Sequence, residues 1–125
     1  MCLQGTIHTS TITQENAIVA WKEMLKTEDS STSEVKYVPA YQSNDAVFKR
    51  GLNTSKRPGF HVYLKKEEAL KSTRCYRGGH DDRTEYKLVR VKIWGRVRFG
   101  DQWNCECASA TNMEIVNFTN ILRWR

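Results

Sequence analysis

The stretch YKLVRVKIWGRVRF, residues 86–99, decides the fold of this 125-residue chain. Along it, apolar side chains alternate with basic or aromatic ones, which is the period of two that a half-buried strand requires. The apolar set, expected to face the core, is Val89, Val91, Ile93, Val97 and Phe99. The outward set is Arg90, Lys92, Trp94, Arg96 and Arg98. Gly95 falls on the apolar side, where a glycine indicates a bulge or the close approach of another backbone.

A second strand follows, and its register can be argued from the side chains that meet across the hairpin. A two-residue loop of Gly100 and Asp101 would turn polar side chains of the second strand toward the core. A three-residue loop, 100–102, avoids this, because a slip of one residue turns every side chain to the other face. The predicted core pairs are Phe99 with Trp103, Val97 with Cys105, and Gly95 with Cys107. The predicted outer pairs are Arg96 with Glu106 and Arg98 with Asn104.

Turn residues and composition place the other elements. Pro58-Gly59 precedes a predicted strand at Phe60–Leu64, and the helix-forming run after it predicts a short helix over Lys65–Ser72. Ile115–Trp124 is a further strand candidate. Loops are expected at residues 27–34 and 77–82.

The segment Ala17–Leu25 is ambiguous, because it fits a helix capped by Thr13 as well as a buried strand. Length predicts a single domain, residues 1–125. The elements together predict an α+β fold, built mainly on an antiparallel sheet with one or two short helices.

Charge bounds the function. Twenty Lys and Arg against fourteen Asp and Glu give a net charge of +6, and such a surface attracts nucleic acid, acidic protein patches and phosphorylated ligands. The N-terminus lacks the basic and apolar regions of a secretory signal, and no apolar run approaches the roughly 18 residues of a membrane span. We therefore expect a cytoplasmic protein with reduced cysteines and no membrane partner.

Two basic groups form the candidate binding site. The first, the cationic row, is the outward set Arg90, Lys92, Trp94, Arg96 and Arg98. Alternate side chains on a strand lie about 6.6–6.8 Å apart, close to the spacing of phosphates along an extended single strand, and an aromatic side chain among them can stack a base. The second, the basic loop, is Lys49, Arg50, Lys56 and Arg57. The alternatives are solvated surfaces, with Glu106 balancing Arg96, or a protein interface centred on Trp94.

No metal site, cofactor or catalytic set is predicted. Zinc needs four nitrogen or sulfur ligands, and the only candidate set has poor spacing and two inward thiols: Cys75, His80, Cys105 and Cys107. Nothing in the sequence fixes an acid–base or nucleophilic geometry for the remaining candidates. These are His61, His80, Asp81, Asp82 and Cys75.

Several segments resemble a group of short, uncharacterised proteins of tailed phages and prophages. They are Met1-Cys2-Leu3, residues 18–25, residues 37–41, Gly59-Phe60-His61-Val62-Tyr63 with the helix carrying Glu68-Ala69-Leu70, and Ala108-Ser109. The likeness is spread thinly over most of the chain. It implies a phage origin, an accessory role in the host cytoplasm, and a strand rather than a helix near Trp21.

The Gly-Phe-His-Val-Tyr strand and its helix also resemble the middle motif of ADP-ribosyltransferase folds. That resemblance implies a nicotinamide site using Tyr63 and a late catalytic Glu114, with His8 as the early residue. The preferred prediction is a phage accessory protein that binds a host protein, such as a defence-system component, or an anionic ligand such as nucleic acid or a nucleotide. An ADP-ribosyltransferase-like enzyme or its inactive descendant, and a minor virion protein, are the alternatives.

Overall fold

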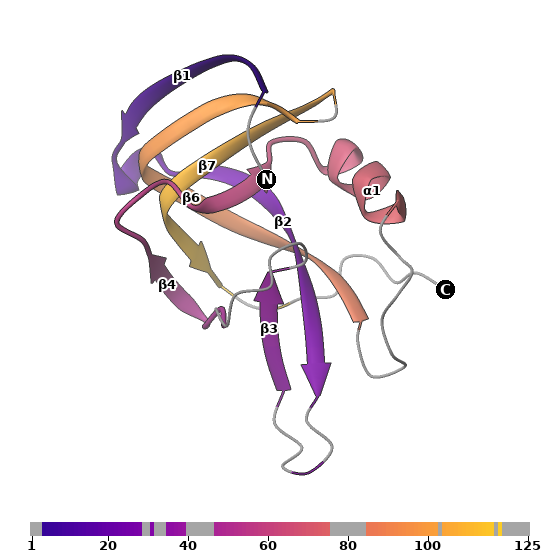
Figure 1. Ribbon diagram of the computed structural model, residues 1–125. Coiled ribbons are helices and arrows are strands. Elements are labelled where there is room, and N and C mark those ends of the chain that lie inside the picture. The colour runs from indigo at the N-terminus through magenta and orange to yellow at the C-terminus, as the bar shows by residue number, and fades with distance from the viewer. Residues whose placement is uncertain are drawn as a thin grey trace.

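The computed structural model describes residues 4–28, 31, 35–39, 47–75, 85–102, 104–116 and 118. Curved strands dominate it, with one α-helix at the side (Figure 1). In chain order the elements are β1 (Gln4–Ile12), the 3₁₀-helix η1 (Gln14–Asn16), β2 (Ile18–Glu28), β3 (Val35–Pro39), β4 (Gly51–Thr54), β5 (Phe60–Tyr63), α1 (Lys66–Cys75), β6 (Glu85–Gln102) and β7 (Cys105–Ile115).

The predicted α+β class is wrong, because the described residues form a β-dominated fold with seven antiparallel strands and one α-helix. The ambiguous segment at residues 17–25 is responsible for much of the difference. From Ile18 onward it lies in β2, as the phage resemblance implies, while Ala17 follows the three-residue η1. No helix in the described part of the chain has the length and apolar character needed to cross a membrane.

Three other predicted elements are confirmed. The strand at residues 86–99 lies within β6, the strand at Phe60–Leu64 matches β5, and the helix at Lys65–Ser72 matches α1. The strand predicted from Ile115 is not found where it can be checked, since Ile115 ends β7 and Val116 is a bend. Its remainder at 119–124 and the loop at 77–82 lie outside the described residues.

β6, with 18 residues, is the strand around which the sheet is organised. β7 pairs along one edge of β6, while β2 and then β1 pair along the other. β5 pairs with both β2 and β7, so the pairings β6–β2–β5–β7 return to β6 and close a circuit. β3 extends β2, and β4 lies on the outer edge of β7 (Figure 1).

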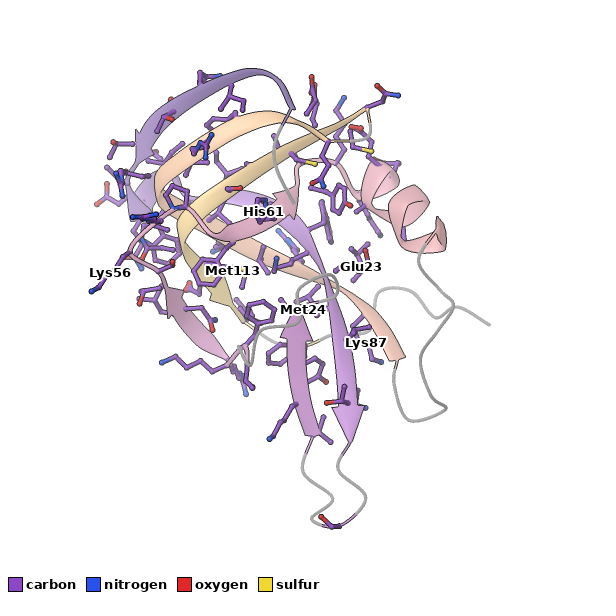
Figure 2. The ribbon with its side chains drawn as sticks, viewed as in Figure 1. Glu23, Met24, Lys56, His61, Lys87 and Met113 are labelled. Atoms are coloured by element: carbon purple, nitrogen blue, oxygen red, sulfur yellow. The ribbon has the colours of Figure 1, made fainter. Side chains whose placement is uncertain are left out.

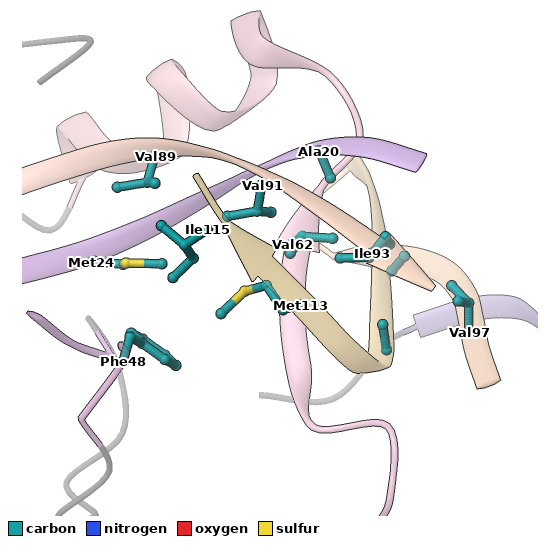
Figure 3. Packing of buried hydrophobic residues seen from close by; sticks show 12 residues of the cluster. Ala20, Met24, Phe48, Val62, Val89, Val91, Ile93, Val97, Met113 and Ile115 are labelled. Carbon is teal, nitrogen blue, oxygen red and sulfur yellow. The ribbon is translucent and has the colours of Figure 1, made fainter. Parts of the chain in front are cut away.

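The main core fills the inside of this circuit. Alternate residues of β6 meet buried residues of β2, β5 and β7 there (Figure 3). Side chains such as Ile93 and Met113 are fully buried, and each burial of this size stabilises the fold by about 1.5–3 kcal/mol. The buried members are Ala20, Met24, Phe48, Val62, Val89, Val91, Ile93, Val97, Ala108, Ala110, Met113 and Ile115.

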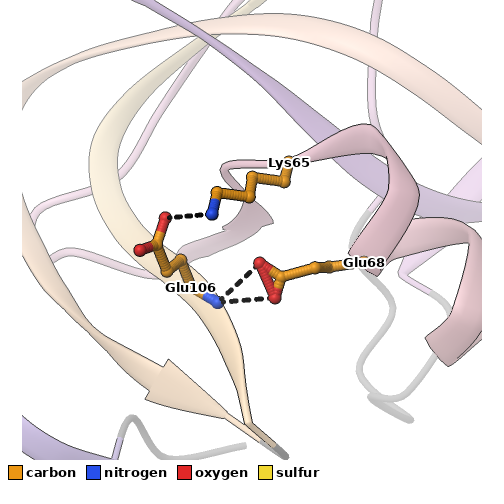
Figure 4. A network of polar contacts seen from close by, with 3 residues as sticks. All are labelled: Lys65, Glu68 and Glu106. Atoms are coloured by element: carbon orange, nitrogen blue, oxygen red, sulfur yellow. Dashed lines mark hydrogen bonds and ion pairs between the residues drawn. The ribbon is translucent and has the colours of Figure 1, made fainter.

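A second cluster lies between the outer side of the sheet and α1. Its buried members are Tyr63, Ala69, Leu88, Cys105 and Cys107. The prediction that the two cysteines are buried is therefore confirmed, although they pack beneath α1 rather than in the main core. The helix is also held by polar contacts (Figure 4). The Glu106 amide donates to both carboxylate oxygens of Glu68, at 3.3 and 3.2 Å, and Lys65 forms a 3.5 Å ion pair with Glu106.

The predicted β6–β7 register is wrong. Gln102 pairs with Cys105, so these paired positions are only three residues apart in sequence, and Asn104 has a positive φ of 62°. Such a conformation is typical of tight hairpin turns. Phe99 pairs with Ala108 and Val97 with Ala110, while Arg98 lies opposite Ser109 instead of Asn104, and Glu106 lies opposite Asp101 instead of Arg96. Trp103 lies outside the described residues.

Candidate anion-binding surface

The cationic row lies on the outer side of β6, as its alternation predicts. Its four basic side chains are exposed and Trp94 is half-buried, whereas Val91, Ile93 and Val97 between them are buried. No side chain of the row belongs to either hydrophobic cluster. The charge therefore stands on the surface, where it meets solvent or a ligand.

A bulge at Gly95 sets the direction of the row. The β6–β7 register shifts by one residue between Trp94 and Val97, and Gly95 has a φ of +88°. The Arg96 amide donates to Thr111 Oγ1 at 3.1 Å, and Asn112 Nδ2 donates to the Trp94 carbonyl at 3.5 Å. These contacts fix the backbone on both sides of the glycine and so position Trp94 and Arg96.

One end of the basic loop meets the row at Arg96. The Arg96 guanidinium (Nη2) donates to the Lys56 carbonyl at 3.0 Å. The loop is held against β7 nearby, because the Ser55 amide donates to the Thr111 carbonyl at 2.8 Å and the Gly59 amide to the Ala110 carbonyl at 3.1 Å. Figure 2 shows Lys56 projecting from this edge of the molecule. We call Lys56, Arg57, Arg96 and Arg98 the basic junction.

The other end of the basic loop is held elsewhere. Lys49 and Arg50 precede β4, whereas Lys56 and Arg57 follow it. The Arg50 Nε donates to the Val116 carbonyl at 2.8 Å, and the Lys49 amide donates to Asn53 Oδ1 at 3.1 Å. The fold therefore brings only the second half of the predicted basic loop to the cationic row.

The surface beside the row is mixed rather than uniformly basic. Lys92 pairs with Glu114 on β7 and with Val19 on β2, and Glu114 in turn pairs with Leu52 on β4. Val19 and Leu52 are 37% and 44% exposed. An acidic residue thus lies across from Lys92, whereas Arg96 and Arg98 lie across from the neutral Thr11 and Thr9 of β1. The basic junction is the less compensated end of the row.

A polar cluster next to the junction was not found from the sequence. His61 pairs with Ser109, which pairs with Arg98, and the Ser109 hydroxyl lies 2.8 Å from His61 Nδ1. Burial lowers the pKa of His61 to about 4, with Lys22 and Arg98 adding to the effect. The imidazole is therefore neutral at pH 7. Ser109 is only 2% exposed, so its hydroxyl is not placed to attack a substrate.

Lys22 supports this cluster from β2. Its ammonium donates to the His61 carbonyl at 2.7 Å and lies 5.4 Å from the centre of the Phe48 ring. Burial lowers the pKa of Lys22 to about 8, partly offset by Glu23. A buried lysine beside His61 adds positive potential behind the junction. The sequence could not reveal this contact, because Lys22 and His61 are 39 residues apart and are brought together only by the pairing of the strands.

The candidate metal-binding and catalytic residues of the sequence analysis do not form a site in the part of the chain that the structure describes. Burial raises the pKa of Cys107 to about 12, so its thiol is protonated and a poor ligand or nucleophile at neutral pH. No group of three or more metal-ligating side chains occurs among the described residues. The Cys75 side chain, His80, Asp81 and Asp82 lie outside that description.

The residues that the ADP-ribosyltransferase resemblance implies are also apart. Tyr63 pairs with Cys107, and Glu114 lies seven residues further along β7, or roughly 20 Å in an extended strand. Tyr63 is buried beneath α1, and His8 stacks on Phe99 at 4.9 Å between ring centres. These positions do not converge on one nicotinamide-sized site.

No protein-family model, curated protein or solved structure matches this chain. The function is therefore inferred from the chemistry of this surface.

Proposed function

We propose that this protein acts by binding a single-stranded nucleic acid, in an accessory role during phage infection. The observation that carries the proposal is the 3.0 Å hydrogen bond from Arg96 to the Lys56 carbonyl. It joins the cationic row to the second half of the basic loop, so two basic segments that are 40 residues apart in sequence present one surface.

The chemistry of this surface suits a phosphate backbone. Arginine presents a planar fork of donors that matches phosphate oxygens, and Arg90, Arg96 and Arg98 are all exposed. Exposed charges on the outer face of β6 neutralise a ligand without the desolvation penalty of buried ions. The affinity should therefore come mainly from counterion release and fall steeply with salt.

Trp94 favours a single-stranded nucleic acid, whose bases are accessible, over a simple anion as the ligand. It lies in the middle of the cationic row, and its backbone is fixed by Asn112 and by the Gly95 bulge. Aromatic side chains held among basic residues are the usual platform for unpaired bases. A mononucleotide would use only part of the row, so affinity should rise with oligonucleotide length.

The test is fluorescence anisotropy with labelled oligothymidylates of increasing length, using three variants of Trp94. Trp94→Ala should weaken binding by roughly 1–3 kcal/mol, the usual value of one stacked base. Trp94→Phe should retain most of the affinity because it keeps an aromatic face, whereas Trp94→Leu should resemble Trp94→Ala.

Circular dichroism would establish that each variant remains folded. Equal affinity of Trp94→Ala and the unmodified protein would exclude stacking. If no oligonucleotide binds and the immobilised protein instead retains a host protein, the ligand is a protein and not a nucleic acid.

A further inference from the structure

A second tryptophan lies beside the end of the cationic row that is far from the basic junction. Trp21 of β2 pairs with Arg90 of β6. Two residues earlier on β2, Val19 pairs with Lys92. Trp21 lies on the outer side of the sheet, as the row does, because it packs against the cluster beneath α1 that includes Leu88. Its side chain is half-buried, so it remains partly accessible from solvent.

The surroundings of Trp21 repeat those of Trp94, an aromatic side chain among cations. Lys66, the first residue of α1, places its ammonium 5.6 Å from the centre of the Trp21 ring. Lys66 and Arg90 are both exposed, so both can reach a phosphate next to a base on Trp21. The lysine side chain is flexible and can leave the ring when a base stacks there. These are the components of a second stacking platform.

The two tryptophans have a spacing that suits one continuous single strand. Trp21 is level with Arg90, and Arg90 is two outward steps from Trp94 along β6, or about 13 Å. Each step is close to the phosphate spacing of an extended single strand, so bases on the two rings would be two nucleotides apart. Val19 lies at the intervening step and is 37% exposed, so the base between them can rest on it.

We propose that Trp21 is a second base-stacking position, and that the bound strand runs along β6 from the basic junction past Trp94 to Trp21 and Lys66. This inference rests on the proposed function and extends its ligand from one stacked base to a segment of at least three nucleotides. Glu67 follows Lys66 and is exposed. Its negative charge offsets that of the lysine, so this end of the site should contribute more by stacking than by charge.

The test is the affinity of the full chain for labelled hexathymidylate, measured by fluorescence anisotropy. Trp21→Leu keeps an apolar side chain against α1 and removes the aromatic face, so it should weaken binding roughly 5- to 150-fold, the usual effect of one stacked base. Trp21→Phe should retain most of the affinity. Trp21→Leu combined with Trp94→Ala should multiply the two single losses, because well-separated positions that hold different bases act independently.

Leu70→Ala is the control for an indirect effect on the fold. It removes packing from the same cluster beneath α1 but keeps the tryptophan ring, so it should bind hexathymidylate as the unmodified protein does. A second pair of variants changes exposed positions only. Lys66→Ala should weaken binding severalfold, whereas Lys65→Ala should not, because the Lys65 ammonium is paired with Glu106 at 3.5 Å.

The outcomes separate this inference from the proposed function. If Trp94→Ala weakens binding and Trp21→Leu does not, the second stacking position is wrong and the proposed function stands. The inference is also overturned if Trp21→Phe binds as weakly as Trp21→Leu, or if Leu70→Ala loses as much affinity as Trp21→Leu. Absence of binding by the unmodified protein would overturn the proposed function and this inference with it.

Discussion

Gly95 is the residue on which the shape of the candidate site depends most. Its φ of +88° is one that side-chain-bearing residues rarely adopt, and a Cβ there would meet Thr111 Oγ1 and Asn112 Nδ2. Those two atoms take part in the contacts that position Arg96 and Trp94. The sequence predicted a bulge or close approach at Gly95, and the structure has both.

Replacing Gly95 by alanine should therefore destabilise the fold by more than conformational strain alone. Gly51→Ala is the matched control, since Gly51 has a φ of +95° and open space where a Cβ atom would stand. The control should cost about 1–2 kcal/mol, the usual penalty of the left-handed region. Urea unfolding of Gly95→Ala should show a clearly larger loss, with weaker oligonucleotide binding. Equal losses of stability in the two variants would mean that the side chains of Thr111 and Asn112 move aside for the new Cβ atom.

At the scale of elements, alternation predicted the faces of β6 correctly but did not predict its pairing with β7. The predicted register required β7 to have only one buried face. In fact Cys105 and Cys107 are buried beneath α1, while Ala108 and Ala110 are buried in the main core. With both faces buried, the alternation of polar and apolar residues no longer distinguishes one register from the next.

The attachment of α1 makes this second buried face possible, and Glu68 is the contact to test. Glu68→Ala removes both acceptors of the Glu106 amide and should destabilise the protein by about 1–2 kcal/mol. Glu68→Gln should recover part of this, because it keeps one acceptor oxygen. Glu67→Ala, an exposed neighbour in the same first turn, should change stability by only a few tenths of a kcal/mol.

Thermal unfolding with hydrogen exchange at the Glu106 amide separates these cases. Faster exchange should appear in Glu68→Ala and not in Glu67→Ala. Unchanged exchange in Glu68→Ala would show that the carboxylate does not protect this amide.

At the scale of the whole molecule, the sequence predicted which residues are basic and outward but not which of them meet. Lys56 and Arg57 reach the cationic row because residues 55–59 run along β7, whereas Lys49 and Arg50 lie at the far end of β4. That division follows from the pairing of β4 with β7, and no local pattern in residues 49–57 reveals it. Likewise, no local pattern reveals that His61, Ser109 and Arg98 lie next to one another on three neighbouring strands.

On the proposed function, a local surface and not the net charge binds the nucleic acid. Arg96→Glu with Arg98→Glu reverses the basic junction, and Lys26→Glu with Lys36→Glu makes the same change, from +6 to +2, on the β2–β3 hairpin. The decisive measurement is oligothymidylate affinity against salt concentration for both variants.

We predict that the junction variant loses most of its affinity and that the slope of log affinity against log salt falls by about 1.4, for two lost phosphate contacts at about 0.7 each. The hairpin variant should keep both the affinity and the slope of the unmodified protein. Equal weakening of the two variants, or undiminished binding by the junction variant, would contradict the account.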